Sequence, residues 1–318
     1  MAVRQYRKIL WEFHQGESPV DEIDESIVAL LEVDGRLSHV DIAREVGLSR
    51  SAAAARIHRL LSSGEVEVRG VVHPAVIGRG ALAHVGITVD GPAMGLAAQV
   101  ARREDIPFLS MATGQYGLVA EVRAGSAHDV DRAVAELRAL DGVVGVDTLT
   151  YVEVVRDVIG PVGDVPTHVD GTDLALLKAL QDDGRASYVD LAGAVGLSAA
   201  GVRRRIIRLT ESQVVRIGAV VRHAGRDRQT ALGFGVRLGG DHPEVAQLLA
   251  AMPAVIFVAR TLGRFDILGT IRAFTARQLI ELLDTIRSTP GVRAVDSWAH
   301  LQVVKETYAS GLDLPDHE

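Results

Sequence analysis

The sequence of 318 residues contains no cysteine, which excludes disulfide bonds and thiolate chemistry and fits a cytoplasmic protein. Aromatic residues make up only 4% of the chain and hydrophobic residues 47%, so we expect cores built mainly of Val, Leu and Ala. No segment approaches the roughly 20 apolar residues that a membrane-spanning helix needs. The first residues also lack the long apolar run of a signal peptide. We therefore expect a cytoplasmic location.

The sequence also lacks the common signatures of enzymes. Its 11 His residues are scattered, without the H-x-x-x-H spacing of a metal site. No G-x-S-x-G elbow, phosphate-binding loop or G-x-G-x-x-G turn occurs. We expect no bound metal, no cofactor and no enzymatic activity.

The net charge of −7 argues only weakly against nucleic-acid binding, because phosphate contacts depend on local charge. Residues 21–72 contain six Arg against ten Asp and Glu, a local charge of −4. Residues 170–222 contain eight Lys and Arg against six Asp and Glu, a local charge of +2. The second segment is therefore the better electrostatic partner for DNA.

Residues 46–60 recur in altered form as residues 195–209. In each copy a Gly makes a tight turn, and a Ser caps the helix that follows. In the second copy Val202, Ile206 and Leu209 form an apolar stripe at helical spacing, which leaves the arginines facing outward. A short capped helix with a cationic outer face is typical of a helix that reads DNA.

The predicted DNA contacts are the capping serines and the outward-facing side chains of these two helices: Ser49, Arg50, Ser51, Arg56 and Arg59 in the first copy, and Ser198, Arg203, Arg204, Arg205 and Arg208 in the second. Ala52 to Ala55 stand where the second copy has Gly201 to Arg204. We therefore expect the first module to bind DNA more weakly or to read shape and thymine methyls. The plainer alternatives are a merely solvated arginine surface and a purely structural first module.

From about Ala81 the hydrophobic period changes from 3.6 to 2, as Val85, Ile87 and Val89 alternate with small or polar residues. A helix, two strands hinged at residues 114–117, a second helix and a last strand follow. This β-α-β-β-α-β order predicts an antiparallel, ferredoxin-like sheet with helices on one face.

The whole pattern then repeats at a constant offset of 149 residues, which pairs Asp34 with Asp183, Gly47 with Gly196, Gly114 with Gly263, and Gly142 with Gly291. Such a register indicates duplication. The predicted fold class is α+β, with two winged-helix-like helix-turn-helix modules, each followed by a ferredoxin-like effector module. The predicted boundaries are an N-terminal leader 1–20, DNA-binding module 21–72, effector module 80–156, linker 157–169, DNA-binding module 170–222, effector module 229–306 and acidic tail 307–318.

These motifs resemble those of a known family. Asp183 to Ala192, followed by Val195 to Ser198, resembles the helix-turn-helix of the Lrp/AsnC (leucine-responsive, feast/famine) transcription regulators. Asp34 to Ser38 with Val46 to Ser49 resembles it too, and Gly263-Arg264-Phe265-Asp266 resembles the Gly-Asp-Phe-Asp hairpin of the family's effector domain. Since ordinary members carry one copy and assemble as dimers and larger rings, this chain resembles a fused pseudo-dimer, with its two sheets back to back.

The resemblance implies a sequence-specific, DNA-binding transcription regulator that binds an amino acid or related metabolite between effector modules and forms homo-oligomers through them. The predicted effector residues are Gly114, Tyr116, Arg260, Gly263, Arg264, Phe265 and Asp266. The Asp266 carboxylate suits an ammonium group, and the turn at Gly263 offers backbone N–H donors. Gly and Asp are also the ordinary residues of turns, so a purely structural hairpin is the alternative. Gly117 stands where the second copy has Asp266, so the first copy has lost its effector site or changed its ligand.

Two other functions stay open. Siroheme decarboxylases resemble Lrp/AsnC proteins, occur as fused pairs and use His and Arg around a tetrapyrrole, but residues 108–112 and 257–261, the matching strands here, contain no His. The second alternative is a ligand-binding protein in which both DNA-binding modules are vestigial.

Overall fold

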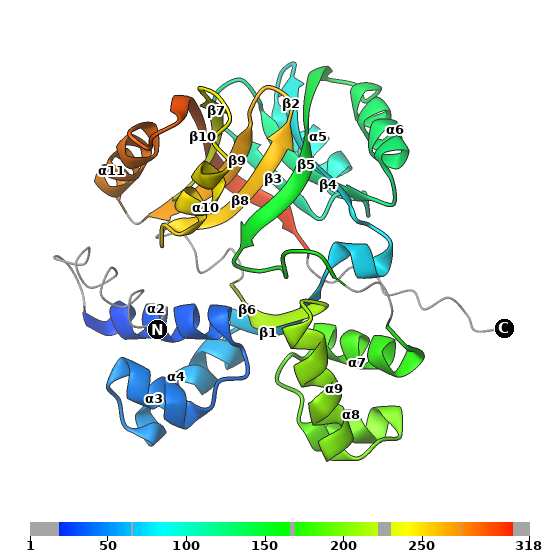
Figure 1. Cartoon of the computed structure of the whole chain (residues 1–318), viewed down its shortest axis with the longest axis vertical. Coiled ribbons are helices and arrows are strands. Elements are labelled where there is room, and N and C mark those ends of the chain that lie inside the picture. The colour runs from blue at the N-terminus through cyan, green and yellow to red at the C-terminus, as the bar shows by residue number, and fades with distance from the viewer. Residues whose placement is uncertain (1–18, 65, 166–168, 222–229, 274, 308–318) are drawn as a thin grey trace.

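The computed structural model describes residues 19–64, 66–165, 169–221, 230–273 and 275–307. The described residues form two layers, a pair of helix-turn-helix units and a β-barrel above them (Figure 1). No helix within the described ranges is both long and apolar enough to cross a membrane. The mixed α and β content and the two helix-turn-helix units confirm the predicted fold class.

Each helix-turn-helix unit consists of three helices and a strand: α2 (Pro19–Val33), α3 (His39–Val46), α4 (Arg50–Ser62) and β1 (Val66–Val72) in the first, and α7 (Gly171–Asp182), α8 (Tyr188–Val195), α9 (Ala199–Glu211) and β6 (Val215–Val221) in the second. Both turns pass through a glycine with positive φ, 72° at Gly47 and 68° at Gly196. The first helix begins at Pro19, two residues before the predicted start of the module at residue 21, since the fixed φ of proline suits a first helical turn. The leader expected at 1–20 lies mostly outside the described residues, as does the tail from 308 onward.

The two units are joined edge to edge through β1 and β6, which pair antiparallel from Val66–Val221 to Val72–Val215. A reciprocal arginine contact reinforces this ribbon. Arg36 donates to the carbonyl oxygens of Gly184 (2.7 Å) and Ala186 (2.9 Å). Its counterpart in the second copy, Arg185, donates to the carbonyl oxygens of Gly35 (2.6 Å) and Leu37 (3.3 Å). The chain thus contains a complete helix-turn-helix pair with a fixed spacing.

The upper layer confirms the predicted β-α-β-β-α-β order in both copies. The first copy runs through β2 (Ala81–Val89), α5 (Ala93–Val100), β3 (Phe108–Ala112), β4 (Leu118–Ala124), α6 (Ala127–Arg138) and β5 (Val143–Asp157), after a short 3-10 turn, η1 (Pro74–Ile77). The second runs through β7 (Thr230–Leu238), α10 (Glu244–Ala250), β8 (Val255–Leu262), β9 (Ile267–Ala273), α11 (Ala276–Arg287) and β10 (Val292–Glu306).

The two sheets do not simply lie back to back, as the sequence had suggested, but join at both edges into one closed barrel, in the order β10-β3-β4-β2-β5-β8-β9-β7. The cause is the length of β5 and β10, 15 residues each. The first half of β5 pairs with β2 and its second half with β8 of the other copy. β10 pairs in the same way with β7 and then β3. Closure removes every unpaired edge of the two sheets.

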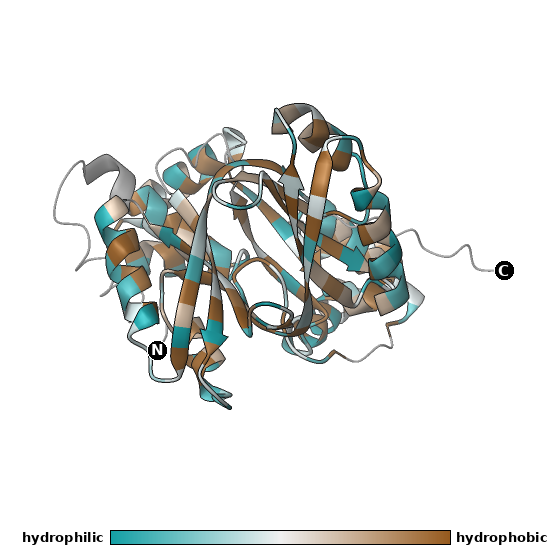
Figure 2. Ribbon diagram, turned by 90° about the horizontal axis from the view of Figure 1, so that it is seen from above, coloured by the Kyte–Doolittle hydropathy of each residue, from teal (hydrophilic) through white to brown (hydrophobic). Residues whose placement is uncertain are grey.

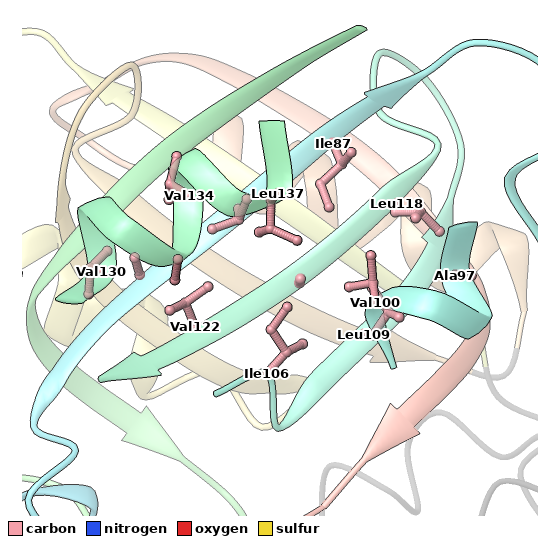
Figure 3. Packing of buried hydrophobic residues seen from close by; sticks show 14 of the residues in the cluster. Ile87, Ala97, Val100, Ile106, Leu109, Leu118, Val122, Val130, Val134 and Leu137 are labelled. Atoms are coloured by element: carbon pink, nitrogen blue, oxygen red, sulfur yellow. The ribbon is translucent and has the colours of Figure 1, made fainter. Parts of the chain in front are cut away.

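The hydrophobic cores lie outside the barrel, between its strands and the helices on its flanks (Figure 2). In the first copy Val130, Val134 and Leu137 of α6 pack on Ile87 and Val122 of the sheet (Figure 3). Because side chains alternate along a strand, the opposite set of residues points into the barrel. The helices thus cover one apolar face of the strands, and the other face, which points into the barrel, carries aromatic and polar residues together with a few aliphatic ones.

Arg36→Ala tests the joint between the two helix-turn-helix units. We expect the free energy of unfolding to fall by about 2 kcal/mol, because two hydrogen bonds from a charged donor are lost. Urea titration followed by circular dichroism measures it. Arg44→Ala removes an exposed arginine that forms ion pairs with its neighbours Asp41 and Glu45, and should change stability by less than about 0.5 kcal/mol. Equal losses in the two variants would contradict the role given to Arg36.

Candidate functional site

Four of the arginines predicted to contact DNA are held by carboxylates of their own chain. Asp173 on α7 has a side chain only 1% exposed, and it accepts from Arg205 (2.8 Å) and from Arg208. Arg205 also donates to the helix cap Asp170 (2.6 Å), and this bond holds the pKa of the Asp170 carboxyl below its usual value. In the first copy Asp24 on α2 is the counterpart of Asp173.

Asp24 accepts from Arg56 (2.7 Å) and from Arg59, which are the counterparts of Arg205 and Arg208. Because the same arrangement occurs in both copies, it fastens the recognition-type helix to the first helix of its own unit. The structure therefore corrects the expectation that all the arginines of α4 and α9 point freely outward. Their first partner is a carboxylate, although Arg59 and Arg208 remain more than half exposed.

Arg203 and Arg204 differ from these four. Both are exposed on α9, and neither has a side-chain partner among the described residues. Their counterparts in the first copy are Ala54 and Ala55, so α4 has nothing equivalent at these positions. Arg50, at the start of α4, is exposed. The two units therefore present unequal cationic surfaces.

The predicted capping serines are confirmed as caps. The Ser49 hydroxyl accepts from the backbone N–H of Ala52, and the Ser198 hydroxyl accepts from that of Gly201. Ser51 is exposed, and its hydroxyl lies 3.1 Å from that of Ser49. The first turn of each helix thus keeps free N–H groups and the positive end of its dipole near the surface.

The predicted effector residues lie at the end of the barrel farther from the helix-turn-helix layer, where the structure brings three of them together. Arg264 donates to Gln115 (2.7 Å) and to the Tyr116 hydroxyl (2.7 Å) of the first copy. Arg264 also forms ion pairs with Asp147 (3.2 Å) and with Asp296 (3.1 Å), which is the counterpart of Asp147 in the second copy. Tyr116 and Phe265 are buried in one cluster beneath it. Burial, followed by the hydrogen bond to Asp147, raises the pKa of Tyr116 well above its ordinary value.

The other predicted effector residues lie apart from that contact. The Asp266 side chain is exposed, and its Oδ2 accepts from the backbone N–H of Leu238 (2.7 Å). Gly263 and Gly114 occupy the two hairpins with φ of 143° and 91°. Arg260 lies on β8 and forms an exposed ion pair with Glu153 (3.5 Å).

The barrel contains a cavity of about 730 Å³ that was not predicted from the sequence. Its wall is aromatic and mixed with charge: Phe108, Tyr151, Phe257, Trp298, His84, His300, Glu121, Arg123 and Arg272. Arg123 and Arg272 are counterparts separated by 149 residues, as are Phe108 and Phe257. The signal was present in the sequence, in the inward-facing set of alternating positions, where charged and aromatic residues are mixed with the aliphatic ones that fill a closed barrel.

The two imidazoles of the cavity are neutral near neutral pH. Burial, followed by the charge of His300, lowers the pKa of His84 to about 3, and burial lowers that of His300 to about 4. The His300 Nδ1 lies 2.6 Å from the Ser110 hydroxyl. His84 stacks obliquely on Trp298, with ring centroids 5.6 Å apart. Across the described residues no group of three or more His, Asp or Glu is arranged to hold a metal ion.

Family models match both helix-turn-helix units and part of the barrel. The AsnC-type helix-turn-helix domain matches residues 20–61 and again 169–210, and a C-terminal dimeric alpha+beta barrel domain matches residues 242–313. The HTH-type transcriptional regulator FL11 of Pyrococcus horikoshii is 30% identical over 155 residues, which cover 46% of this chain and 96% of FL11. The chain belongs to the Lrp/AsnC family.

A second relative in the Lrp/AsnC family, the HTH-type transcriptional regulator LysM of Sulfurisphaera tokodaii, is 27% identical over 135 residues, 42% of this chain and 96% of LysM. Each relative is therefore matched by less than half of this chain, as expected of a duplicated member. Over nearly the whole chain the fold is similar to that of the siroheme decarboxylase NirDL, solved with an iron-uroporphyrin III analogue. That match has a TM-score of 0.58 at 15% identity and covers 89% of this chain and 93% of NirDL.

The depressed pKa of His84 makes stability depend on pH. Between pH 6.5 and 3 the unfolded chain binds a proton at this position that the folded chain does not, so stability is complete above pH 6.5 and falls as the pH is lowered through this window. At pH 5 the loss from His84 amounts to about 2 kcal/mol. Urea unfolding at pH 7.5 and pH 5 should show that His84→Gln removes this part of the difference. His58→Gln, which changes an exposed residue of α4, should leave it intact; a pH dependence unchanged by His84→Gln would refute the assignment.

Proposed function

We propose that the chain is a sequence-specific DNA-binding transcription regulator that carries both halves of an Lrp/AsnC dimer. The observation that carries the proposal is the exposed pair Arg203 and Arg204 on a capped helix, which has no side-chain partner among the described residues. The helix belongs to a unit that β1, β6 and the Arg36–Arg185 contact hold at a fixed distance from its twin. Two reading helices at fixed spacing suit two half-sites on one face of a duplex.

The two half-sites should be unequal. Arg203 and Arg204 are available for phosphates or guanine edges in the second unit, whereas the first offers mainly Arg50, Ser51 and a row of alanines. We infer that the second unit supplies most of the base-specific contacts. The first unit adds phosphate contacts and reads the shape of its half-site.

An amino acid or related metabolite is the proposed effector at the hairpin end of the barrel. Asp266 uses Oδ2 for the Leu238 N–H, while its Oδ1 has no partner within the described part of the chain and suits an ammonium group. Exposed apolar side chains on the barrel support further assembly of chains: Val152 (56%) on β5, its counterpart Leu301 (65%) on β10, and Leu262 (67%) on β8. A ligand shared by two modules would change their arrangement and thereby DNA affinity.

Replacing Arg203 and Arg204 together by Gln tests the DNA-binding proposal. We expect affinity for a fragment of the protein's own promoter to fall at least tenfold at physiological salt, and the slope of log K against log salt to lessen by about 1 for each lost phosphate contact. Fluorescence anisotropy at several salt concentrations measures both.

The matched control is Arg277→Gln with Arg287→Gln, which removes the same charge from exposed positions on α11, far from the helix-turn-helix layer. If the two double variants bind promoter DNA equally, α9 is not the reading helix.

A second candidate function, decarboxylation of a tetrapyrrole, is favoured by one observation. The barrel encloses a cavity with two imidazoles and two arginines, and its fold is similar to that of NirDL over most of the chain. Residues 108–112 and 257–261, the strands that match those of the decarboxylases, lack His. However, His84 of β2 and His300 of β10 line the cavity. Against it, replacing a carboxylate by hydrogen requires a proton donor, and imidazoles with pKa values of about 3 and 4 are not in the acidic imidazolium form near neutral pH.

Incubation with siroheme separates the two functions. As the protein is proposed to be a regulator, we expect no loss of CO₂ from siroheme by mass spectrometry after prolonged incubation under reducing, anaerobic conditions. A product lighter by one or two carboxyl groups, formed by the wild type and not by His84→Gln, would establish the decarboxylase instead.

A further inference from the structure

Arg272 is a largely buried cation with few partners among the described residues. It lies on β9 with its side chain 14% exposed, and within that part of the chain its ion pair is to Glu32 of α2, over 3.5 Å. A guanidinium group carries five N–H donors, and burial without acceptors is costly. Its counterpart Arg123 has a closer partner, because its Nε donates to the Glu121 carboxylate over 2.5 Å. Of the two arginines in the cavity wall, Arg272 is therefore the one prepared to receive a carboxylate.

The space beside Arg272 suits a flat ring. In the strand register Arg272 lies next to Ala231, which lies next to His300, so a small residue separates the guanidinium from an imidazole. Phe257, Phe108 and Trp298 add aromatic faces to the same cavity. The indole Nε1–H of Trp298 is buried with no acceptor among the described residues. Aromatic walls favour a stacked ring, and the unpaired donors favour oxygen atoms on it.

The acidic groups of the cavity restrict where a carboxylate can lie. Glu121 is paired with Arg123, and Asp157 accepts from the backbone N–H of Ile159 (2.8 Å) at the mouth. Glu306 lies at the same mouth. A negative ligand is therefore repelled from the mouth and attracted most strongly toward the β9 wall, because Arg123 is already neutralised by Glu121 and Arg272 is less closely paired.

The partner of Arg272 connects the cavity to the DNA-binding layer. Glu32 belongs to α2, and its backbone carbonyl accepts from Arg216 of β6 (3.1 Å). Arg216 also donates to the carbonyl of Asp157 at the end of β5 (2.9 Å). One cluster thus joins the barrel mouth, the first helix of the first unit and the ribbon between the two units.

We propose that the barrel cavity binds a small aromatic carboxylate, whose carboxylate group pairs with Arg272 in competition with Glu32 and whose ring stacks among the cavity aromatics. Binding frees Glu32 and loosens α2 from the barrel. The proposed binding site depends only on the observed cavity, whereas the proposed effect of binding on DNA affinity rests on the proposed regulator function.

Isothermal titration calorimetry with 2-naphthoate tests the site, with the neutral 2-naphthamide as matched ligand. We expect one 2-naphthoate per chain and an affinity at least tenfold higher than that of the amide. Arg272→Gln should weaken binding of the acid about tenfold and leave the amide unchanged. Glu32→Gln should strengthen binding of the acid, because the competing carboxylate is gone; a merely structural Glu32 would not produce this gain.

Two further variants guard against misfolding as the cause. Ala231→Phe keeps Arg272 but fills the space beside it, and should abolish binding while the urea midpoint and circular dichroism stay close to wild type. Arg277→Gln, on the outer surface of α11, should leave binding unchanged. Absence of heat with millimolar 2-naphthoate, or equal affinity of the wild type and Arg272→Gln, would overturn the proposal.

Promoter DNA binding is measured separately, with and without 2-naphthoate. We expect the acid to change DNA affinity for the wild type and not for Ala231→Phe. If 2-naphthoate binds as described but the wild type does not bind DNA at all, the regulator function fails and the ligand site stands. If DNA binding is intact and unchanged by bound 2-naphthoate, the coupling through Glu32 is refuted.

Discussion

Edge pairing within one chain is the constraint on which the structure depends. Each copy of the ferredoxin-like module would expose strand edges if it stood alone, and β5 and β10 remove them by running on into the other copy. The same solution appears below, where β1 of one unit pairs with β6 of the other. What two subunits accomplish in a dimer is here fixed by covalent connection, so its integrity does not depend on protein concentration.

Because the two copies are covalently connected, their sequences can differ, and they do differ in the barrel interior. Trp298 lies over Gly233, where a Cβ atom would come within 2.2 Å of the indole nitrogen. The corresponding residues of the first copy are Leu149 and His84, a smaller residue opposite a larger one. His84 and Trp298 then contact each other across the interior. The equivalent positions on the other side of the interior hold Gly233 and Leu149, so the His84–Trp298 contact occurs once, whereas two identical subunits would carry it twice.

Most of the local structure could be predicted from the sequence, because caps, turns and hydrophobic period are short-range signals. Ser49, Ser198, Gly47 and Gly196 act as expected, and so does the strand and helix order of both modules. The partners of charged residues could not be predicted. Asp173 lies 35 residues from Arg208 in sequence, and only the packing of α7 against α9 brings the two together. The cavity could not be predicted for a similar reason, since residues from all eight strands of the barrel form its wall.

The arginine pattern on α4 and α9 separates what both copies need from what one copy does. The Asp24 and Asp173 contacts occupy equivalent positions in both units, so their common task is to set the angle of the recognition-type helix. Arg203 and Arg204 occur in the second copy alone, at positions that contribute nothing to the packing of the unit. Alanine at the equivalent positions of the first copy keeps the helix while removing the hydrogen-bond donors. A scaffold retained in both copies and a charged face retained in one is the pattern expected if, as we propose, the fold is required twice and base reading chiefly once.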